Sequence, residues 1–347
     1  MRDTLFSLCL CMYIIYNLTN ITIGNSVTSI GSSAFYKCSS LTSVKIPDSV
    51  MSISSSAFKY CSGLTSVTIG NSVTSIGNDA FCNCSSLTSV YYTGTIDQWV
   101  QIDFKSSFAN PLYYAKNLYI NNKFVTEANI TTATKINSYA FYNCGGLTSV
   151  TIGNNVESIG ESAFSGCTGL TNVTIGNSVT SIGCDAFYNC SSLMSVVWNA
   201  EKCTVGVTLS ASGERSIFSN CSKLTTITIG DNVKTIPSQA FYKCSSLTSV
   251  TIGSSVTSIG PYAFGYCIGL ISITIPDSVT SIYYNAFYNC NNLKDVFYKG
   301  TASEWKKISI ESDNSHLTAA TRYYYSESQP AESGNYWHYE DGEIAVW

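Results

Sequence analysis

Residues 247–269 read LTSVTIGSSVTSIGPYAFGYCIG, and close copies of this stretch recur along most of the 347-residue chain. The copies begin 23 residues apart, except for two longer intervals of 37 and 31 residues. The starting residues are Leu18, Leu41, Leu64, Leu87, Phe124, Leu147, Leu170, Leu193, Leu224, Leu247, Leu270 and Leu293. We interpret the two longer intervals as insertions that leave the repeat in register, because a fixed period of this length indicates a repeat architecture.

Each 23-residue repeat predicts one coil of a solenoid. Its first part, as in 147–152, alternates like a strand that buries one face. A turn at position 7 and a second short strand, VTSI, are expected next. The segment that follows, of the type SSAFYNC, has Ala, Phe and Cys at helical spacing and predicts about one helical turn. A single coil cannot bury its apolar residues, so neighbouring coils must stack.

Stacking places identical residues above one another in the core. Phenylalanines are predicted to form one such ladder, at Phe35, Phe58, Phe81, Phe141, Phe164, Phe187, Phe218, Phe241, Phe264 and Phe287. Cysteines form a second, at Cys38, Cys61, Cys84, Cys144, Cys167, Cys190, Cys221, Cys244, Cys267 and Cys290. Disulfides are one possibility for so many cysteines, but stacked side chains have parallel Cβ vectors and do not point at one another. We therefore favour reduced, buried thiols that act as small hydrophobic groups.

Composition argues against several functional classes. Charged residues make up 12% of the chain, the net charge is −4, and no basic stripe is present, so nucleic acid is not expected as a partner. The only histidines are His316 and His338, and no cysteine spacing matches a zinc motif. The sequence therefore predicts no catalytic site, no metal and no cofactor.

Two segments depart from the repeat with the pattern GTxxxW. In each, the Thr and the residue three positions later form a capping box that predicts a short helix. The capping pairs are Thr95 with Gln98 and Thr301 with Glu304, the tryptophans are Trp99 and Trp305, and Ile102 and Ile308 follow. We interpret the tryptophans as structural anchors, because Trp and Ile at helical spacing give the helix one apolar face to bury. Sugar binding by these tryptophans is the alternative.

The chain divides into three predicted regions. Residues 1–17 are a degenerate first coil, a weak signal-like segment or a truncated start, and their apolar run is too short to span a membrane. Residues 18–297 form the solenoid, with insertions near 91–123 and 199–213. Residues 298–347 hold the second GTxxxW module and an aromatic C-terminal cap, which ends in a hairpin around Asp341 and Gly342. After the first insertion the solenoid restarts at Phe124 with Ala128 and Ile130 one residue out of phase, which predicts a bulge.

The pattern LTSVxIPxSVTSIGxxAFxxCxx resembles the BspA-type leucine-rich repeat, which is found in bacterial surface proteins and in some parasitic protists. The resemblance covers residues 18–297. It implies an α/β repeat in which strands dominate, a right-handed leucine-rich-repeat solenoid of about twelve coils with short helical turns. It also implies an extracellular or cell-surface location, a role in adhesion or host-protein binding, and no enzymatic activity.

We therefore expect a noncatalytic module that binds an extracellular protein or glycan. A structural spacer or surface-assembly protein without a ligand is the main alternative, and an ice- or crystal-binding surface is a weaker one. On the first strand of each coil, positions 3 and 5 point outward and mostly carry small hydroxyl residues. Because specific binding needs larger anchors, the candidate surface comprises Lys45, Tyr91, Val197, Asp295 and Phe297. Tyr91 and Phe297 adjoin the GTxxxW modules, which could instead cover them.

Overall fold

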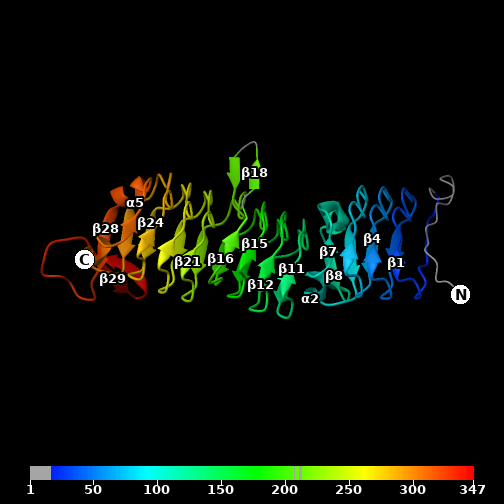
Figure 1. Cartoon of the computed structure of the whole chain (residues 1–347), viewed down its shortest axis with the longest axis horizontal. Coiled ribbons are helices and arrows are strands. Elements are labelled where there is room, and N and C mark those ends of the chain that lie inside the picture. The colour runs from blue at the N-terminus through cyan, green and yellow to red at the C-terminus, as the bar shows by residue number, and fades with distance from the viewer. Residues whose placement is uncertain (1–16, 207, 211–212) are drawn as a thin grey trace. The chain divides into compact units, whose positions relative to one another are not determined.

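The computed structural model describes residues 17–206, 208–210 and 213–347. The interpretations of residues 1–17 thus concern a segment that lies, except for Asn17, outside the described residues. The described residues form two compact units. The first contains residues up to 170 together with 186–191, and the second contains residues 171–185 together with 192–347. Each unit is a stack of coils in which short parallel strands dominate (Figure 1).

In the first unit, the opening strands of successive coils pair in parallel in two separate runs, one before and one after residue 125. These first strands are β2 (Ser43–Lys45), β4 (Ser66–Ile69), β6 (Ser89–Tyr92), β8 (Leu118–Ile120), β10 (Glu127–Ile130) and β12 (Ser149–Ile152), with β9 (Lys123–Phe124) antiparallel to β8. The second strands are β1 (Ser29–Ile30), β3 (Ser52–Ile53), β5 (Ser75–Ile76), β7 (Asp103–Phe104), β11 (Lys135–Ile136) and β13 (Ser158–Ile159). Ser43 lies opposite Ser66, which confirms the predicted 23-residue register.

The second unit repeats this arrangement. Its first strands are β14 (Asn172–Ile175), β16 (Ser195–Trp198), β20 (Thr226–Ile229), β22 (Ser249–Thr251), β24 (Ser272–Ile275), β26 (Asp295–Tyr298) and β28 (Thr321–Tyr325). Its second strands are β15 (Ser181–Ile182), β17 (Thr204–Val205), β21 (Thr235–Ile236), β23 (Ser258–Ile259), β25 (Ser281–Ile282) and β27 (Ser309–Ile310). The insertion near 199–213 contains an antiparallel pair, β18 (Thr208–Ser210) and β19 (Gly213–Arg215).

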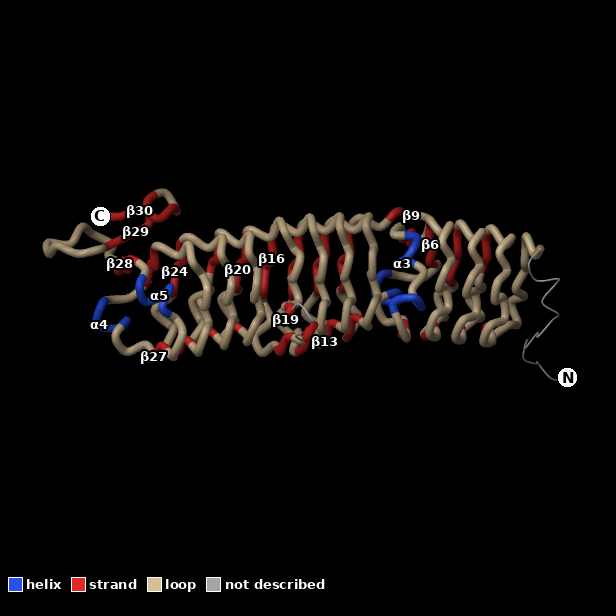
Figure 2. Tube along the Cα trace, turned by 90° about the horizontal axis from the view of Figure 1, so that it is seen from above, coloured by secondary structure: helices blue, strands red, loops and turns tan. Residues whose placement is uncertain are grey.

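The C-terminal tail forms the predicted hairpin. Strands β29 (Tyr336–Glu340) and β30 (Glu343–Val346) are antiparallel, and β29 extends the sheet beside β28 (Figure 2). Asp341 and Gly342 both have positive φ angles, of 50° and 87°. Two successive positive φ values are the signature of the tight turns that match the twist of hairpin strands.

The predicted phenylalanine ladder is confirmed. In the first unit, Phe58 stacks on Phe81 with ring centroids 5.3 Å apart, and Phe164 stacks on Phe187 at 5.1 Å. In the second unit, Phe264 stacks on Phe287 at 5.4 Å. All of these rings are fully buried. Burying one such side chain contributes about 2–3 kcal/mol, so the ladder is a major source of stability in each unit.

The segment that carries Ala, Phe and Cys is not a helical turn, contrary to the prediction. It forms consecutive turns in which two residues are left-handed, as at Ser56 (φ 58°) and Tyr60 (φ 64°). Its N–H groups alternate between two kinds of partner. The N–H of Phe58 donates to a carbonyl of the next coil at 2.8 Å, whereas the N–H of Ala57 donates within its own turn at 3.3 Å. A helix would direct all of these N–H groups along its own axis, and the bonds between coils would be lost.

The GTxxxW modules begin with the predicted capping boxes. In α2 (Ile96–Trp99) and α4 (Ala302–Trp305), the Thr and Gln or Glu side chains bond reciprocally to the backbone. Both helices end at their tryptophan, so the prediction that Ile102 and Ile308 lie on the same helix is wrong. Both isoleucines are nevertheless buried, from the turn that follows. The modules also contain η1 (Ser107–Ala109), α3 (Leu112–Ala115) and α5 (Ser315–Ala319), and α3 packs beside β6 (Figure 2).

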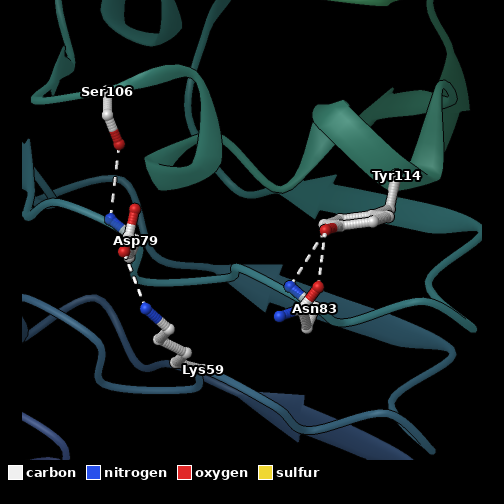
Figure 3. A network of polar contacts seen from close by, with 5 residues as sticks. All are labelled: Lys59, Asp79, Asn83, Ser106 and Tyr114. Carbon is white, nitrogen blue, oxygen red and sulfur yellow. Dashed lines mark hydrogen bonds and ion pairs between the residues drawn. The ribbon is translucent and has the colours of Figure 1, made fainter.

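The first module covers the turns of the coil that precedes it with polar side chains (Figure 3). In other coils, the left-handed turn residues donate their N–H groups to carbonyls of the next coil. The N–H of Asp79 instead donates to Ser106 Oγ at 3.3 Å, and that of Asn83 donates to Tyr114 Oη at 2.9 Å. The Asp79 carboxylate also pairs with Lys59 at 2.8 Å. The module thus replaces the hydrogen-bond acceptors that a regular coil would supply.

The solenoid does not restart at Phe124 with a bulge, contrary to the prediction. Phe124 lies in β9, and its side chain is 44% exposed. Val125 is buried instead, and its N–H donates to Leu118 O at 2.9 Å. From there β10 and β12 pair continuously with a spacing of 22 residues, Ala128 opposite Val150. This coil is therefore one residue shorter than the regular coils of 23 residues.

Candidate binding surfaces

Among the described residues, no group of three or more His, Cys, Asp or Glu side chains is placed to hold a metal ion. The two histidines lie on separate elements of the second unit, His316 in α5 and His338 in β29. The His338 ring stacks on Trp347, with ring centroids 3.7 Å apart. A histidine that acts as a general base is usually oriented by a carboxylate, which also stabilises its charged form. An indole ring does neither, so the His338–Trp347 pair is a packing contact.

The ladder cysteines are hydrogen-bond donors, a role that sequence reasoning missed. The thiol of Cys167 donates to the carbonyl of Phe141 in the preceding coil, at 3.1 Å. Cys61, Cys84, Cys190, Cys267 and Cys290 make the same contact at 3.1–3.3 Å. Burial raises the pKa of Cys84, Cys144 and Cys290 to about 12 and that of Cys167 well above its usual value. These four thiols therefore carry no nucleophilic thiolate near neutral pH.

In the first unit, the outward face of the first strands carries a cluster of aromatic side chains. Position 5 of successive strands places Lys45 beside Thr68, Thr68 beside Tyr91, and Tyr91 beside Tyr119. Phe124 continues this row, because it lies opposite Tyr119 in the antiparallel pair of β8 and β9. Lys45 is exposed, and Tyr91 and Tyr119 are half-buried. The structure thus brings two of the candidate residues, Lys45 and Tyr91, into one row.

We call Tyr91, Tyr119 and Phe124 the aromatic row. The rings of Tyr91 and Tyr119 stack with centroids 4.8 Å apart, and those of Tyr119 and Phe124 are 5.3 Å apart. The Phe124 ring also lies against Gly146, where any side chain would clash with it. These contacts fix the rings in place, so little side-chain entropy is left to lose on binding. Sequence reasoning missed Tyr119 because it lies in the predicted insertion near 91–123, and it missed Phe124 because that residue was taken as the start of a coil.

The candidate residues of the second unit lie in two different environments. Val197 is half-buried at position 5 of β16, between Thr174 and Thr228 of the neighbouring strands. Phe297 is only 9% exposed. Its ring stacks on Tyr323 at 5.1 Å and meets the Trp337 ring edge-on at 5.7 Å. The C-terminal tail thus covers Phe297 and leaves little of its ring for a partner.

Asp295 is half-buried at position 3 of β26, between Ser272 and Thr321. A hollow of about 250 Å³ lies near this position, between the hydroxyl groups of β22 and β24 and the hairpin residues Tyr339 and Glu343. Its volume falls below the range of about 300–1,000 Å³ that is typical of small-ligand sites.

Both GTxxxW tryptophans are buried against the backbone. Trp99 is inaccessible to solvent, and its Nε1 donates to Ala140 O at 2.8 Å. Trp305 is nearly buried, and the Arg322 guanidinium lies over its ring at 4.3 Å from the centroid. Neither ring offers a free face on which a sugar could stack.

A comparison with protein-family models agrees with this architecture. A family model described as the BspA-type leucine-rich repeat region matches residues 10–131, 134–206 and 212–319, in six copies. A leucine-rich repeat protein from Bacteroides ovatus is 24% identical, with 86% of this chain and 87% of that protein covered and a TM-score of 0.45. A leucine-rich cell surface protein from Faecalibacterium prausnitzii is 26% identical, with 85% and 90% covered and a TM-score of 0.39. A search of curated proteins gave no match.

Proposed function

Because the chain belongs to the BspA-type leucine-rich repeat family, we propose that it is a noncatalytic recognition module that binds an extracellular partner. Proteins of this family generally mediate protein binding or have roles at surfaces, which supports a location outside the cell or on its surface. None of the helices in the described part of the chain has the length and hydrophobicity of a membrane span. We assign a protein partner to the first unit, at the aromatic row.

The observation that carries this proposal is the contrast between the aromatic row and its surroundings. The other outward positions of β2, β4 and β6 carry Ser43, Ser66, Thr68 and Ser89, whose hydroxyl groups gain little on binding because water competes for them. Tyrosines that are packed in place are typical of the few residues that dominate protein interfaces. Lys45 lies two strands from Tyr91, on the order of 10 Å away, and adds a charge at the rim. We propose that Lys45 acts chiefly on specificity and association rate.

The test compares the capture of proteins from an extracellular-matrix extract by the natural chain and by a Tyr91→Ser, Tyr119→Ser, Phe124→Ser variant. We expect the variant to lose about 2 kcal/mol or more of binding free energy, about thirtyfold in Kd for the captured protein. A Met51→Ser, Met194→Ser variant is the control, because both methionines are exposed but lie outside the row. Equal capture by the two variants would reject the row as the binding surface.

A second substitution keeps the test valid if the triple variant folds poorly. Lys45→Glu replaces an exposed side chain, so its melting temperature should not change. We expect it to slow association with the captured protein and to alter the salt dependence of the rate. If the natural chain captures no protein at all, the alternative of a structural spacer without a ligand is favoured.

A further inference from the structure

The second unit has a larger groove, on the face formed by the turns. Its volume is about 700 Å³, within the range of about 300–1,000 Å³ typical of ligand sites. Five tyrosines from three successive coils line it: Tyr242, Tyr262, Tyr266, Tyr284 and Tyr288. The remaining lining residues are Ser238, Gln239, Asn285 and Asp313. The groove is formed by turns of the second unit, whereas the aromatic row is formed by strands of the first unit, so the groove does not depend on the row.

The tyrosines hold one another in edge-to-face contact. Tyr242 meets Tyr262 at 5.8 Å and Tyr266 at 5.4 Å, with ring planes 90° and 88° apart. In the next coil, Tyr262 meets Tyr284 at 5.9 Å and Tyr266 meets Tyr288 at 5.4 Å. In such a pair, the partner ring does not cover the faces of the ring that presents its edge, although Lys243 Nζ lies over the Tyr242 and Tyr266 rings. Tyr242 is 7% exposed and Tyr284 is 45% exposed. The groove therefore has a buried tyrosine at its base and an exposed tyrosine at its edge.

Two of these tyrosines occupy backbone conformations that tyrosine rarely adopts. Tyr262 and Tyr266 have φ angles of 54° and 61°. Each is held there by an N–H bond to the next coil, from Tyr262 to Tyr284 O at 3.4 Å and from Tyr266 to Tyr288 O at 2.7 Å. The same two turn positions are left-handed in other coils, as at Ser56 and Tyr60, so these φ angles belong to the coil and set the direction in which the tyrosine side chains leave it.

The polar residues of the groove restrict the ligand. The lining contains one carboxylate, Asp313, and Lys243 Nζ lies over two of the lining rings, 5.1 Å from the Tyr242 centroid and 5.8 Å from the Tyr266 centroid. One negative and one positive group offset each other, which favours a ligand without net charge. A wholly apolar ligand would strip water from Gln239, Asn285 and Asp313 without replacing their hydrogen bonds. A pyranose ring satisfies both conditions. Its C–H groups pack on the negative face of an aromatic ring, and its hydroxyl groups bond to amide and carboxylate groups.

We propose that this tyrosine groove is a binding site for a neutral oligosaccharide. Its ring faces hold the sugar rings, and Asn285 and Asp313 select the hydroxyl pattern. The chain would then carry two recognition surfaces with different ligand classes, one on each unit. This site goes beyond the proposed protein-binding role of the aromatic row.

The test is calorimetric titration of the full chain with neutral gluco-, manno- and galacto-hexaoses. We expect at least one of them to saturate, and a Tyr284→Ser, Tyr288→Ser variant to bind it at least tenfold more weakly. The control is Tyr36→Ser, Tyr60→Ser, which removes an edge-to-face pair from equivalent turns of the first unit, with centroids 5.6 Å apart, and should leave binding unchanged.

Two further titrations make the assignment specific. Tetramethylammonium and a decaproline peptide are the other ligands that an aromatic groove can hold. Saturable binding of either one that depends on Tyr284 and Tyr288, without binding of any hexaose, would overturn the assignment. Failure of all the hexaoses to saturate at millimolar concentration, or equal weakening by the control variant, would also overturn it. Because the aromatic-row variant should bind the hexaose normally, failure of one proposal can be told from failure of the other.

Discussion

Raising the pH from 8 to 10 should destabilise the first unit through its buried thiols. Cys84 and Cys144 have pKa values of about 12 in the folded chain, against 9.0 for an ordinary thiol. A group whose pKa is raised by folding stabilises the folded state fully below its unfolded pKa, and this contribution is lost as pH rises toward the folded pKa. At pH 10, one unit above the unfolded value, each thiol costs the fold about 1.4 kcal/mol.

The assay is urea unfolding of the natural chain and of a Cys84→Ala, Cys144→Ala variant at both pH values. The two proteins share every tyrosine and lysine, so the difference between their pH dependences isolates the thiols. We expect the natural chain to lose about 3 kcal/mol more than the variant between pH 8 and 10, about 1 M or more in the urea midpoint. A Val73→Ala, Val156→Ala variant removes buried groups that cannot ionise and should keep the natural pH dependence. Identical pH dependence in all three proteins would refute the reasoning.

Other predictions concern the GTxxxW modules and the remaining thiols. Trp99→Ala should lower the stability of the first unit by about 3–5 kcal/mol in thermal unfolding without weakening hexaose binding; a selective loss of sugar affinity would instead favour a sugar site at Trp99. The Glu304 carboxylate accepts a hydrogen bond from the backbone N–H of Thr301, and this bond lowers the pKa of the carboxyl group from its ordinary value of 4.5. The stabilisation by ionised Glu304 is present above the ordinary carboxyl pKa and is lost as pH falls through the lowered pKa. The Glu304→Gln variant should therefore lose less stability on acidification than the natural chain. Gln98 shows that an uncharged residue can occupy this position of the capping box. Iodoacetamide at pH 8 should label half-exposed Cys184 before any ladder cysteine, as mass spectrometry of tryptic peptides can show; early labelling of the ladder would contradict its burial.

The sequence allowed the fold to be predicted where the same physical requirement recurs in every coil. The alternation around Val150 and the repeated Phe164 required buried strands and a stacked core, and both are present. The conformation of the turns could not be predicted in this way. Ser56 and Tyr60 adopt left-handed conformations because N–H bonds to the next coil outweigh local preference, and these bonds are not apparent within a single repeat.

The candidate surface was less accessible to sequence reasoning. Lys45 and Tyr91 could be placed on the outward face because strand alternation fixes their direction. Phe124 was assigned to the core because the starting leucine of the coil was replaced by another apolar residue, while Val125 fills that position. The sequence contains a pattern that predicts the tyrosine groove, but counting the repeat period alone did not reveal it. Tyr266 and Tyr288 lie near the same point of consecutive coils, and stacking brings such residues together.

The central claim is that the first unit recognises a partner through its aromatic row. Hydrogen–deuterium exchange of the chain, measured with and without the protein captured from extracellular matrix, tests this claim most directly. We expect the partner to slow exchange in peptides that cover β6, β8 and β9, residues 89–92 and 118–124, and to leave the tyrosine groove peptides of residues 238–242 and 284–288 unchanged. Protection confined to peptides outside β6, β8 and β9 would contradict it.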